Sequence, residues 1–198
     1  MKLFKLFILS ITLLAFASCN NGSTPQIKRT EADAARKAAK KPKDPTLMVV
    51  LEKTKGDSIV VTDSETQSKY TLSVSQLLKD KGNHGSLTQQ NKYAVMADLN
   101  KKTISSLINT TELTGIWLLN DKSGTGIRSD EDGSASNIGK IDDITLHSWH
   151  IQKGQLKLTY ILSDGSNYAE QEEEANIIAL SPNQLVVEFR GYKHTFGK

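Results

Sequence analysis

From Thr46 to the last residue, apolar and polar side chains alternate in short runs, and this period of two limits the fold more than any other feature of the sequence. Leu156, Leu158 and Tyr160 share one face of such a run, and Lys157 lies between them on the other face. Successive side chains of a β-strand point to opposite faces of a sheet. The pattern therefore predicts strands with one buried face and a mostly β protein.

Residues 46–110 predict a small five-stranded barrel. Three strand-like runs within 46–74 are separated by turn residues at 55–57 and 63–65, and a single helical turn at 75–80 follows the third run. The runs 91–99 and 102–108 supply two more strands. Five strands with a helical turn after the third resemble the oligonucleotide/oligosaccharide-binding (OB) barrel in topology. An SH3-like barrel would give nearly the same pattern.

Residues 111–198 predict a second barrel. A strand-like run at 112–120 is followed by seven more, and the turns between them contain the pairs Asp-Gly, Lys-Gly and Pro-Asn, which tight turns favour. Eight consecutive strands joined by tight turns predict an up-and-down antiparallel sheet. Closing that sheet into a barrel removes its exposed edges.

Three motifs in this second region, taken in order, resemble a known family. Gly115-Ile116-Trp117 is similar to the Gly-x-Trp signature at the start of lipocalins. The stretches GTGIRSDEDGSASNI (124–138) and HSWHIQKGQLKLTYI (147–161) resemble the lipocalin-like domains of Bacteroidetes lipoproteins. The resemblance covers residues 112–198 and implies an eight-stranded lipocalin-like barrel.

In lipocalins the signature tryptophan closes one end of the barrel and a basic side chain from the last strands covers it. The resemblance implies this role for Trp117, with Arg190 or Lys193 as the covering residue, and such a cation–π contact contributes about 0.5–2 kcal/mol. This barrel is shorter than a typical lipocalin barrel. An eight-stranded barrel is only just wide enough for its own side chains or for one small ligand.

The N-terminus predicts a signal peptide and a lipid anchor. A basic start at Lys2 and Lys5 is followed by an apolar run to Phe16, which is too short to span a bilayer as a mature helix. Small residues then precede Cys19, the only cysteine. This arrangement resembles the bacterial lipobox, although Phe16 stands where Leu is usual. We expect residues 1–18 to be removed and Cys19 to carry a covalent lipid.

Residues 19–45 are expected to form a lipidated polar tether. The segment 27–45 is rich in Ala and Lys, has no apolar face and ends at Pro42 and Pro45. It is typical of a spacer, and an alternative is contact with anionic lipid headgroups. No Asp or other acidic residue directly follows Cys19. The expected location is therefore the cell envelope, most simply the outer membrane facing the periplasm.

The sequence gives no support for several other functions. Removing the signal leaves a nearly neutral chain, which argues against nucleic acid as a partner. His147 and His150 suggest a metal pair, but three residues apart on a regular strand they would face opposite ways. No catalytic triad, paired-carboxylate motif or phosphate loop has a recognisable context. We therefore expect no enzyme activity, no metal and no cofactor beyond the lipid on Cys19.

Two functional hypotheses remain open. In the first, the lipocalin-like barrel holds a small apolar or amphipathic ligand, with Trp149, Tyr160 and Tyr168 as candidate contacts. In the second, the barrel is packed, and the protein binds another protein or a glycan through its outer faces. A cavity of several hundred Å³ inside the barrel would favour the first hypothesis, and a packed interior would favour the second.

Overall fold

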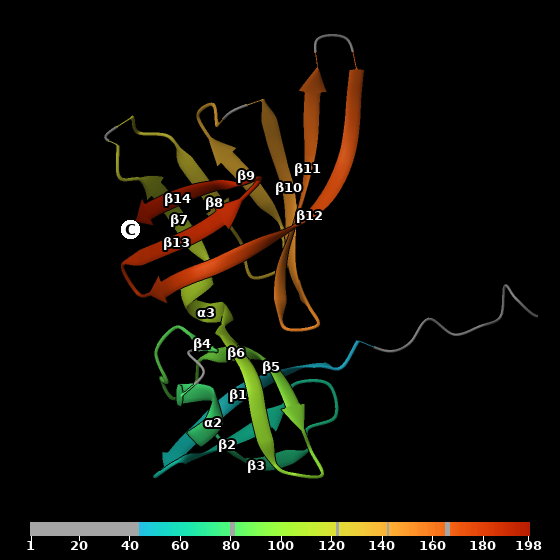
Figure 1. Cartoon of the computed structure of the whole chain (residues 1–198), viewed down its shortest axis with the longest axis vertical. Helices are drawn as coiled ribbons and strands as arrows, with labels where there is room; N and C mark the ends of the chain where they lie inside the picture. The colour runs from blue at the N-terminus through green and yellow to red at the C-terminus, as the bar shows by residue number, and fades with distance from the viewer. Residues whose placement is uncertain (1–43, 80–81, 122, 142, 165–166) are drawn as a thin grey trace, which may run out of the picture. The chain divides into compact units, whose positions relative to one another are not determined.

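The computed structural model describes residues 44–198 except 80–81, 122, 142 and 165–166, and the side chains of 163–164 and 167–168 also lie outside the description (Figure 1). The described residues form two β-barrels in sequence, as predicted. The elements of the first are β1 (Thr46–Lys55), β2 (Ser58–Asp63), β3 (Lys69–Ser73), α2 (Ser75–Lys79), β4 (Asn83–His84), β5 (Lys92–Asp98) and β6 (Thr103–Asn109).

The first barrel is closed. Its strand order is β3-β2-β1-β5-β6, and a parallel bridge between Ser73 of β3 and Thr103 of β6 joins the two ends. The expected five strands, with α2 after the third, are confirmed and give an OB-like arrangement. One element was not among the predicted strands. Asn83 and His84 form the short strand β4 alongside β6.

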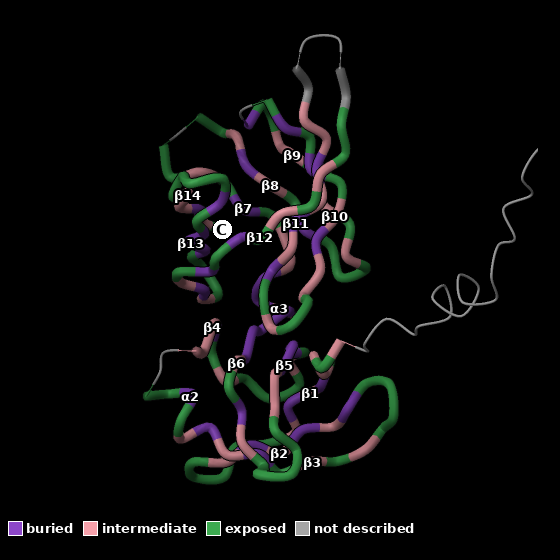
Figure 2. Tube along the Cα trace, turned by 45° about the vertical axis from the view of Figure 1, so that its right-hand side comes forward, coloured by how far each residue is buried: buried purple, intermediate pink, exposed green. Residues whose placement is uncertain are grey.

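The core of the first barrel is formed largely by every second side chain along its strands. In β2 every second residue is buried, and Figure 2 shows buried and less buried positions alternating along the strands of this barrel. The buried side chains form one cluster that contains Val49, Leu51, Ile59, Val61, Leu72, Val74, Leu77, Tyr93, Val95, Ile104 and Leu107.

The second barrel contains all eight predicted strands, joined in chain order by antiparallel pairing. The sheet order is β10-β11-β12-β13-β14-β7-β8-β9, so β9 and β10 lie at its two ends. The strands are β7 (Gly115–Leu119), β8 (Gly126–Ser129), β9 (Ala135–Ile138), β10 (Ile144–Gln152), β11 (Gln155–Asp164), β12 (Asn167–Ser181), β13 (Gln184–Phe189) and β14 (Tyr192–Gly197).

The seam between β9 and β10 is closed largely by side chains, which makes this barrel nearly closed. The amide of Asn137 donates to the carbonyl of Ile144 at 2.8 Å and accepts from the N–H of Leu146 at 2.8 Å. A bridge between Ser134 and Ser148 adds to it, together with a hydrogen bond from the Trp149 N–H to the Gly133 carbonyl at 2.7 Å. The Asn137 side chain thus supplies the bonds that a neighbouring strand would supply.

Strand β12 changes partner along its length. Residues 167–175 pair with β11, and residues 176–181 pair with β13. In Figure 1 β12 runs down from the far end of the β11–β12 hairpin and crosses to β13, while β11 pairs with β10 on its other side. This half therefore has a strand neighbour on one side only among the pairings described.

A short helix joins the two barrels. Helix α3 (Thr110–Leu113) begins after Asn109, whose side-chain oxygen accepts a hydrogen bond from the Glu112 N–H at 3.0 Å. Ala94 and Ile108 of the first barrel belong to the same buried cluster as the core of the second. The two barrels are therefore joined directly through α3, without a long linker.

The turn between β10 and β11 contacts the first barrel. The carboxylate of Asp44 accepts from the Lys153 N–H at 3.1 Å, and the Thr46 hydroxyl accepts from the Gly154 N–H at 3.1 Å. The Ser106 hydroxyl donates to the Gly154 carbonyl at 3.2 Å. Gly154 has φ +70°, and a Cβ there would lie 2.5 Å from Met96 Cγ, so only glycine fits. These contacts fix the turn against the start of β1.

Candidate binding groove

The interior of the second barrel is packed. Trp117, Tyr160 and Leu185 are almost fully buried in it, and Phe189 and Phe196 pack in the same cluster. Apolar spaces of only about 30 Å³ lie in this interior, two of them lined by Leu158 and Val187. A drug-sized ligand needs a pocket of about 300–1,000 Å³. Among the described residues, the barrel interior thus has no room for such a ligand.

Trp117 is fully buried beside α3, and the basic side chain over its ring is not one of the two that the resemblance implied. The Nζ of Lys198, not Arg190 or Lys193, lies 4.3 Å from the centre of the Trp117 ring. It donates to the carbonyls of Glu112 at 2.9 Å and Thr114 at 2.7 Å. These two carbonyls belong to the end of α3, where helix carbonyls lack internal partners. Lys198 therefore caps the end of α3, and this contact holds its ammonium group over the Trp117 ring.

Gly115 is required by the same contact. Its φ is +122°, a conformation that L side chains rarely adopt, and a Cβ there would lie 3.1 Å from Lys198 Cε. The indole N–H of Trp117 donates to the Leu113 carbonyl at 2.8 Å. Gly115 and Trp117 thus both contribute to the packing beside α3.

Arg190 covers a different aromatic ring. Its guanidinium carbon lies 5.8 Å from the centre of the Tyr160 ring, and Phe189 meets that ring edge-on at 5.4 Å. The Tyr160 hydroxyl donates to the Gln171 side chain at 3.1 Å. Burial, together with a hydrogen bond to Glu173, raises the pKa of Tyr160. Tyr160 is therefore a core residue that Arg190 shields.

Trp149, a candidate ligand contact, is also a core residue. It is 7% exposed, and its indole N–H donates to the Asp130 carbonyl at 3.0 Å. A β-bulge between Leu146 and Ser148 inserts an extra residue into β10. Leu146 and Trp149, three residues apart, are consequently both buried.

The same bulge corrects the argument about the histidines. His147 is exposed beside the bulge, and His150 pairs with Lys157 on the outer side of the sheet, so both are on the outer face. The metal prediction was therefore argued from the wrong geometry. Within the described part of the chain, no group of three His, Cys, Asp or Glu side chains is placed to hold a metal ion.

Two further predicted residues lie outside the described side chains. Cys19 belongs to residues 1–43, which the structure does not describe. The backbone of Tyr168 pairs with Ser163 in the β11–β12 hairpin, but its side chain is outside the description. No helix among the described residues has the length and apolar character to cross a bilayer.

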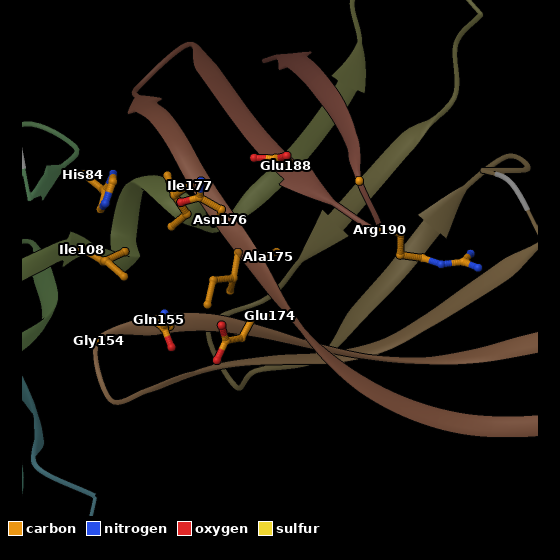
Figure 3. Close-up of a pocket in the computed structure, with 12 residues that line it drawn as sticks. His84, Ile108, Gly154, Gln155, Glu174, Ala175, Asn176, Ile177, Glu188 and Arg190 are labelled. Carbon is orange, nitrogen blue, oxygen red and sulfur yellow. The ribbon is translucent and has the colours of Figure 1, made fainter.

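The candidate site is a groove of about 500 Å³ lined by residues of β11, β12 and β13 of the second barrel and by His84 and Ile108 of the first (Figure 3). Ile108, Leu156, Ala175 and Ile177 give it an apolar floor. Polar side chains surround this floor: His84, Gln155, Glu174, Asn176, Glu188 and Arg190. An apolar floor with a few polar groups is typical of a binding pocket.

The charged groups of the groove are not equivalent. Lys157 lies 2.7 Å from Glu174 and partly neutralises it. Burial lowers the pKa of His84, which favours its neutral form. Arg190 lies against Tyr160, and in Figure 3 its guanidinium points away from the other labelled side chains. The groove therefore presents carboxylates more than cations.

A second groove, of about 600 Å³, lies on the first barrel between the start of β1, the β2–β3 turn and Tyr70. Its carboxylates are occupied by local structure. Asp63 accepts the N–H groups of Glu65 and Thr66, both at 2.8 Å, and Asp44 accepts from Thr46 and Lys153. Asp63 and Asp44 therefore hold local turns together. The groove beside β12 is the stronger candidate for a binding site.

Sequence reasoning missed the residues that join the two barrels. Lys198 lies far in sequence from the helix end that it caps, and Asp44 was placed within the tether. Glu112, whose carboxylate accepts from the Ser86 N–H at 3.1 Å and from the Ser86 hydroxyl, carried no pattern of its own. The one available signal was the glycine of the Lys153-Gly154 pair, which marks a tight turn.

Comparison with known proteins identifies the second barrel only. Residues 109–198 match the family model described as lipocalin-like. A lipocalin-like protein from Bacteroides thetaiotaomicron VPI-5482, with a crystal structure at 1.95 Å resolution, is 23% identical. That match covers 43% of this chain and 95% of the other, with a TM-score of 0.37. No curated protein matches the chain. The predicted lipocalin-like domain is confirmed by the family model.

Proposed function

We propose that the protein is a lipid-anchored, non-enzymatic binding protein of the cell envelope whose packed barrels serve as a scaffold. In this proposal binding takes place on the outer surface, at the groove beside β12, and not inside the lipocalin-like barrel. The lipocalin-like fold is compatible with binding a small ligand, and it is typically a binding fold rather than a catalytic one.

The sizes of the spaces inside and outside the second barrel favour one of the two hypotheses. The spaces inside the second barrel measure about 30 Å³ each, whereas the outer groove measures about 500 Å³. Trp149 and Tyr160, the candidate ligand contacts, fill the core instead of lining a ligand-sized cavity. The comparison favours an interaction protein over a carrier of apolar ligands.

A titration with oleate tests this choice. The folded wild-type chain should show no saturable change in tryptophan fluorescence, because Trp117 and Trp149 are packed by protein. Leu158→Ala is the matched control: this side chain lines both interior spaces, but its loss leaves them far smaller than such a ligand needs, so this variant should also show no saturable change. Saturable binding of one oleate to the wild-type chain would favour the carrier hypothesis and overturn the proposal.

The anchor is tested separately in cells. Cys19→Ala should leave the protein in the soluble periplasmic fraction or unprocessed at its signal peptide, because the substitution removes the thiol to which the acyl chains would be attached. The proposed location is the outer membrane, facing the periplasm. A correctly processed Cys19→Ala protein that still sediments with membranes would show that Cys19 is not the anchor.

A further inference from the structure

Strand β12 has an open edge over residues 167–175. These residues pair with β11 alone, and pairing with β13 begins at Asn176. In an antiparallel strand, every second residue directs its N–H and C=O away from the paired neighbour. From Ala169 to Ala175, where side chains are described, β12 thus offers backbone groups to an added strand.

The groove lies where this open edge ends. Glu174, Ala175, Asn176 and Ile177 line it in succession, and Figure 3 shows them along one strand with Glu188 across from them. A strand added to the edge would place one of its side chains close to the apolar floor. In strand addition, backbone hydrogen bonds give affinity and such pockets give specificity.

The charges along the edge specify the partner. Glu170, Glu172 and Glu174 are exposed at alternate positions, so they lie on one face of β12. His150 Nε2 lies 3.8 Å from Glu172 and Lys157 Nζ lies 2.7 Å from Glu174, so the neighbouring strands supply little positive charge beyond these two groups. An added segment with Lys or Arg at alternate positions would place opposite charges beside this row, which stabilises strand pairs.

A second copy of the same chain fits the edge poorly. Two β12 edges paired with each other would bring glutamates opposite glutamates, and like charges directly opposite destabilise a sheet. Charged side chains on open edges oppose self-association in this way. The same charges that disfavour a second copy favour a basic segment.

We propose that the open edge of β12 binds an extended, lysine- or arginine-bearing segment of a partner protein by strand addition, with one of its side chains in the adjacent groove. This inference rests on the proposed function, because it names the partner class for the outer groove. The oleate titration tests the scaffold independently of any peptide.

The test uses the full folded chain and the synthetic peptide acetyl-(Lys-Val)4-amide, followed by fluorescence anisotropy and by amide hydrogen exchange. Saturable binding is expected, with slower exchange at the open-edge amides within 169–175. The triple variant Glu170→Lys, Glu172→Lys, Glu174→Lys should bind about tenfold more weakly or worse, since three favourable charge pairs become repulsive. Its matched control, Asp57→Lys, Asp121→Lys, Asp143→Lys, changes the net charge equally at exposed turns.

Each remaining outcome decides against the proposal. An equal loss in both triple variants would show non-specific attraction, and binding without slower exchange at 169–175 would show contact without strand addition. No saturable binding of the peptide, or concentration-dependent dimerisation through this edge, would also overturn it. If the peptide fails and oleate also fails to bind, the scaffold proposal stands and only the partner class is wrong.

Discussion

At the residue scale, Trp117 shows how one side chain is held in the core of a barrel. Its indole is fully buried, bonded to the Leu113 carbonyl and covered by Lys198. Trp149 occupies a second buried position and bonds to the Asp130 carbonyl. Both rings therefore contribute packing and a satisfied hydrogen bond.

Trp117→Ala and Trp149→Ala should each lower the free energy of unfolding of the second barrel by about 3–5 kcal/mol, the usual loss for a large buried aromatic. Tyr192→Ala is the control, because Tyr192 is 69% exposed and its loss should cost no more than about 0.5 kcal/mol. Urea denaturation measures all three. Small losses for both tryptophan variants would contradict the packing described here.

Asp44 gives the contact between the barrels a pH dependence. Burial raises the pKa of Asp44, but hydrogen bonds from Thr46 and Lys153 outweigh it, so the pKa lies below its ordinary value of 3.8. A lowered carboxyl pKa stabilises the fold above the unfolded-state value, and this stabilisation is lost as pH falls through the folded-state value.

Asp44→Asn should therefore be less stable than the wild type at neutral pH. The difference in stability between the variant and the wild type should shrink as the pH falls below 3.8. The wild-type Asp44 then becomes protonated and is uncharged, like asparagine. Thermal denaturation of both proteins across this range provides the comparison. A difference that stays constant into acid would mean that the ionised carboxylate of Asp44 does not stabilise the contact.

At the element scale, the seam between β9 and β10 depends on Asn137. Replacing it with Ala removes two hydrogen bonds to the backbone of β10 and should cost about 1–3 kcal/mol. Amide exchange at Leu146 should accelerate, while the exposed neighbouring change Ser136→Ala should leave it unaltered. Unchanged exchange at Leu146 in Asn137→Ala would show that other contacts hold the seam.

The strands could be predicted from sequence because their period of two is a local property of the chain. The bulge in β10 could not, since its extra residue is visible only against the register of β11. That extra residue places both His147 and His150 on the outer face, whereas a regular strand would direct them to opposite faces. The cover of Trp117 was missed for a similar reason. It depends on where the end of β14 meets α3, which sequence spacing does not specify.

At the scale of the whole molecule, the boundary predicted between residues 110 and 111 falls inside α3. Each barrel has its own buried cluster, although Ala94 and Ile108 join the cluster of the second. Separate folding of the two barrels stays a prediction.

Trp117→Ala should unfold the second barrel under mild urea while slow amide exchange persists at Ile59 and Leu72 in the first, because those residues pack in the other cluster. Exchange measured residue by residue by NMR separates the two barrels. Simultaneous loss of protection in both would show that they form a single cooperative unit.

The central claim is that this protein binds on its outer surface and uses its barrels as packed scaffolds. Methyl-resolved NMR of the full chain, titrated with acetyl-(Lys-Val)4-amide and then with oleate, tests it most directly. We expect the peptide to shift the methyl signals of Ala175 and Ile177, while Leu158 and Val187 inside the barrel respond to neither probe. Saturable shifts at Leu158 and Val187 on adding oleate, with none at Ala175 and Ile177 on adding the peptide, would contradict the account.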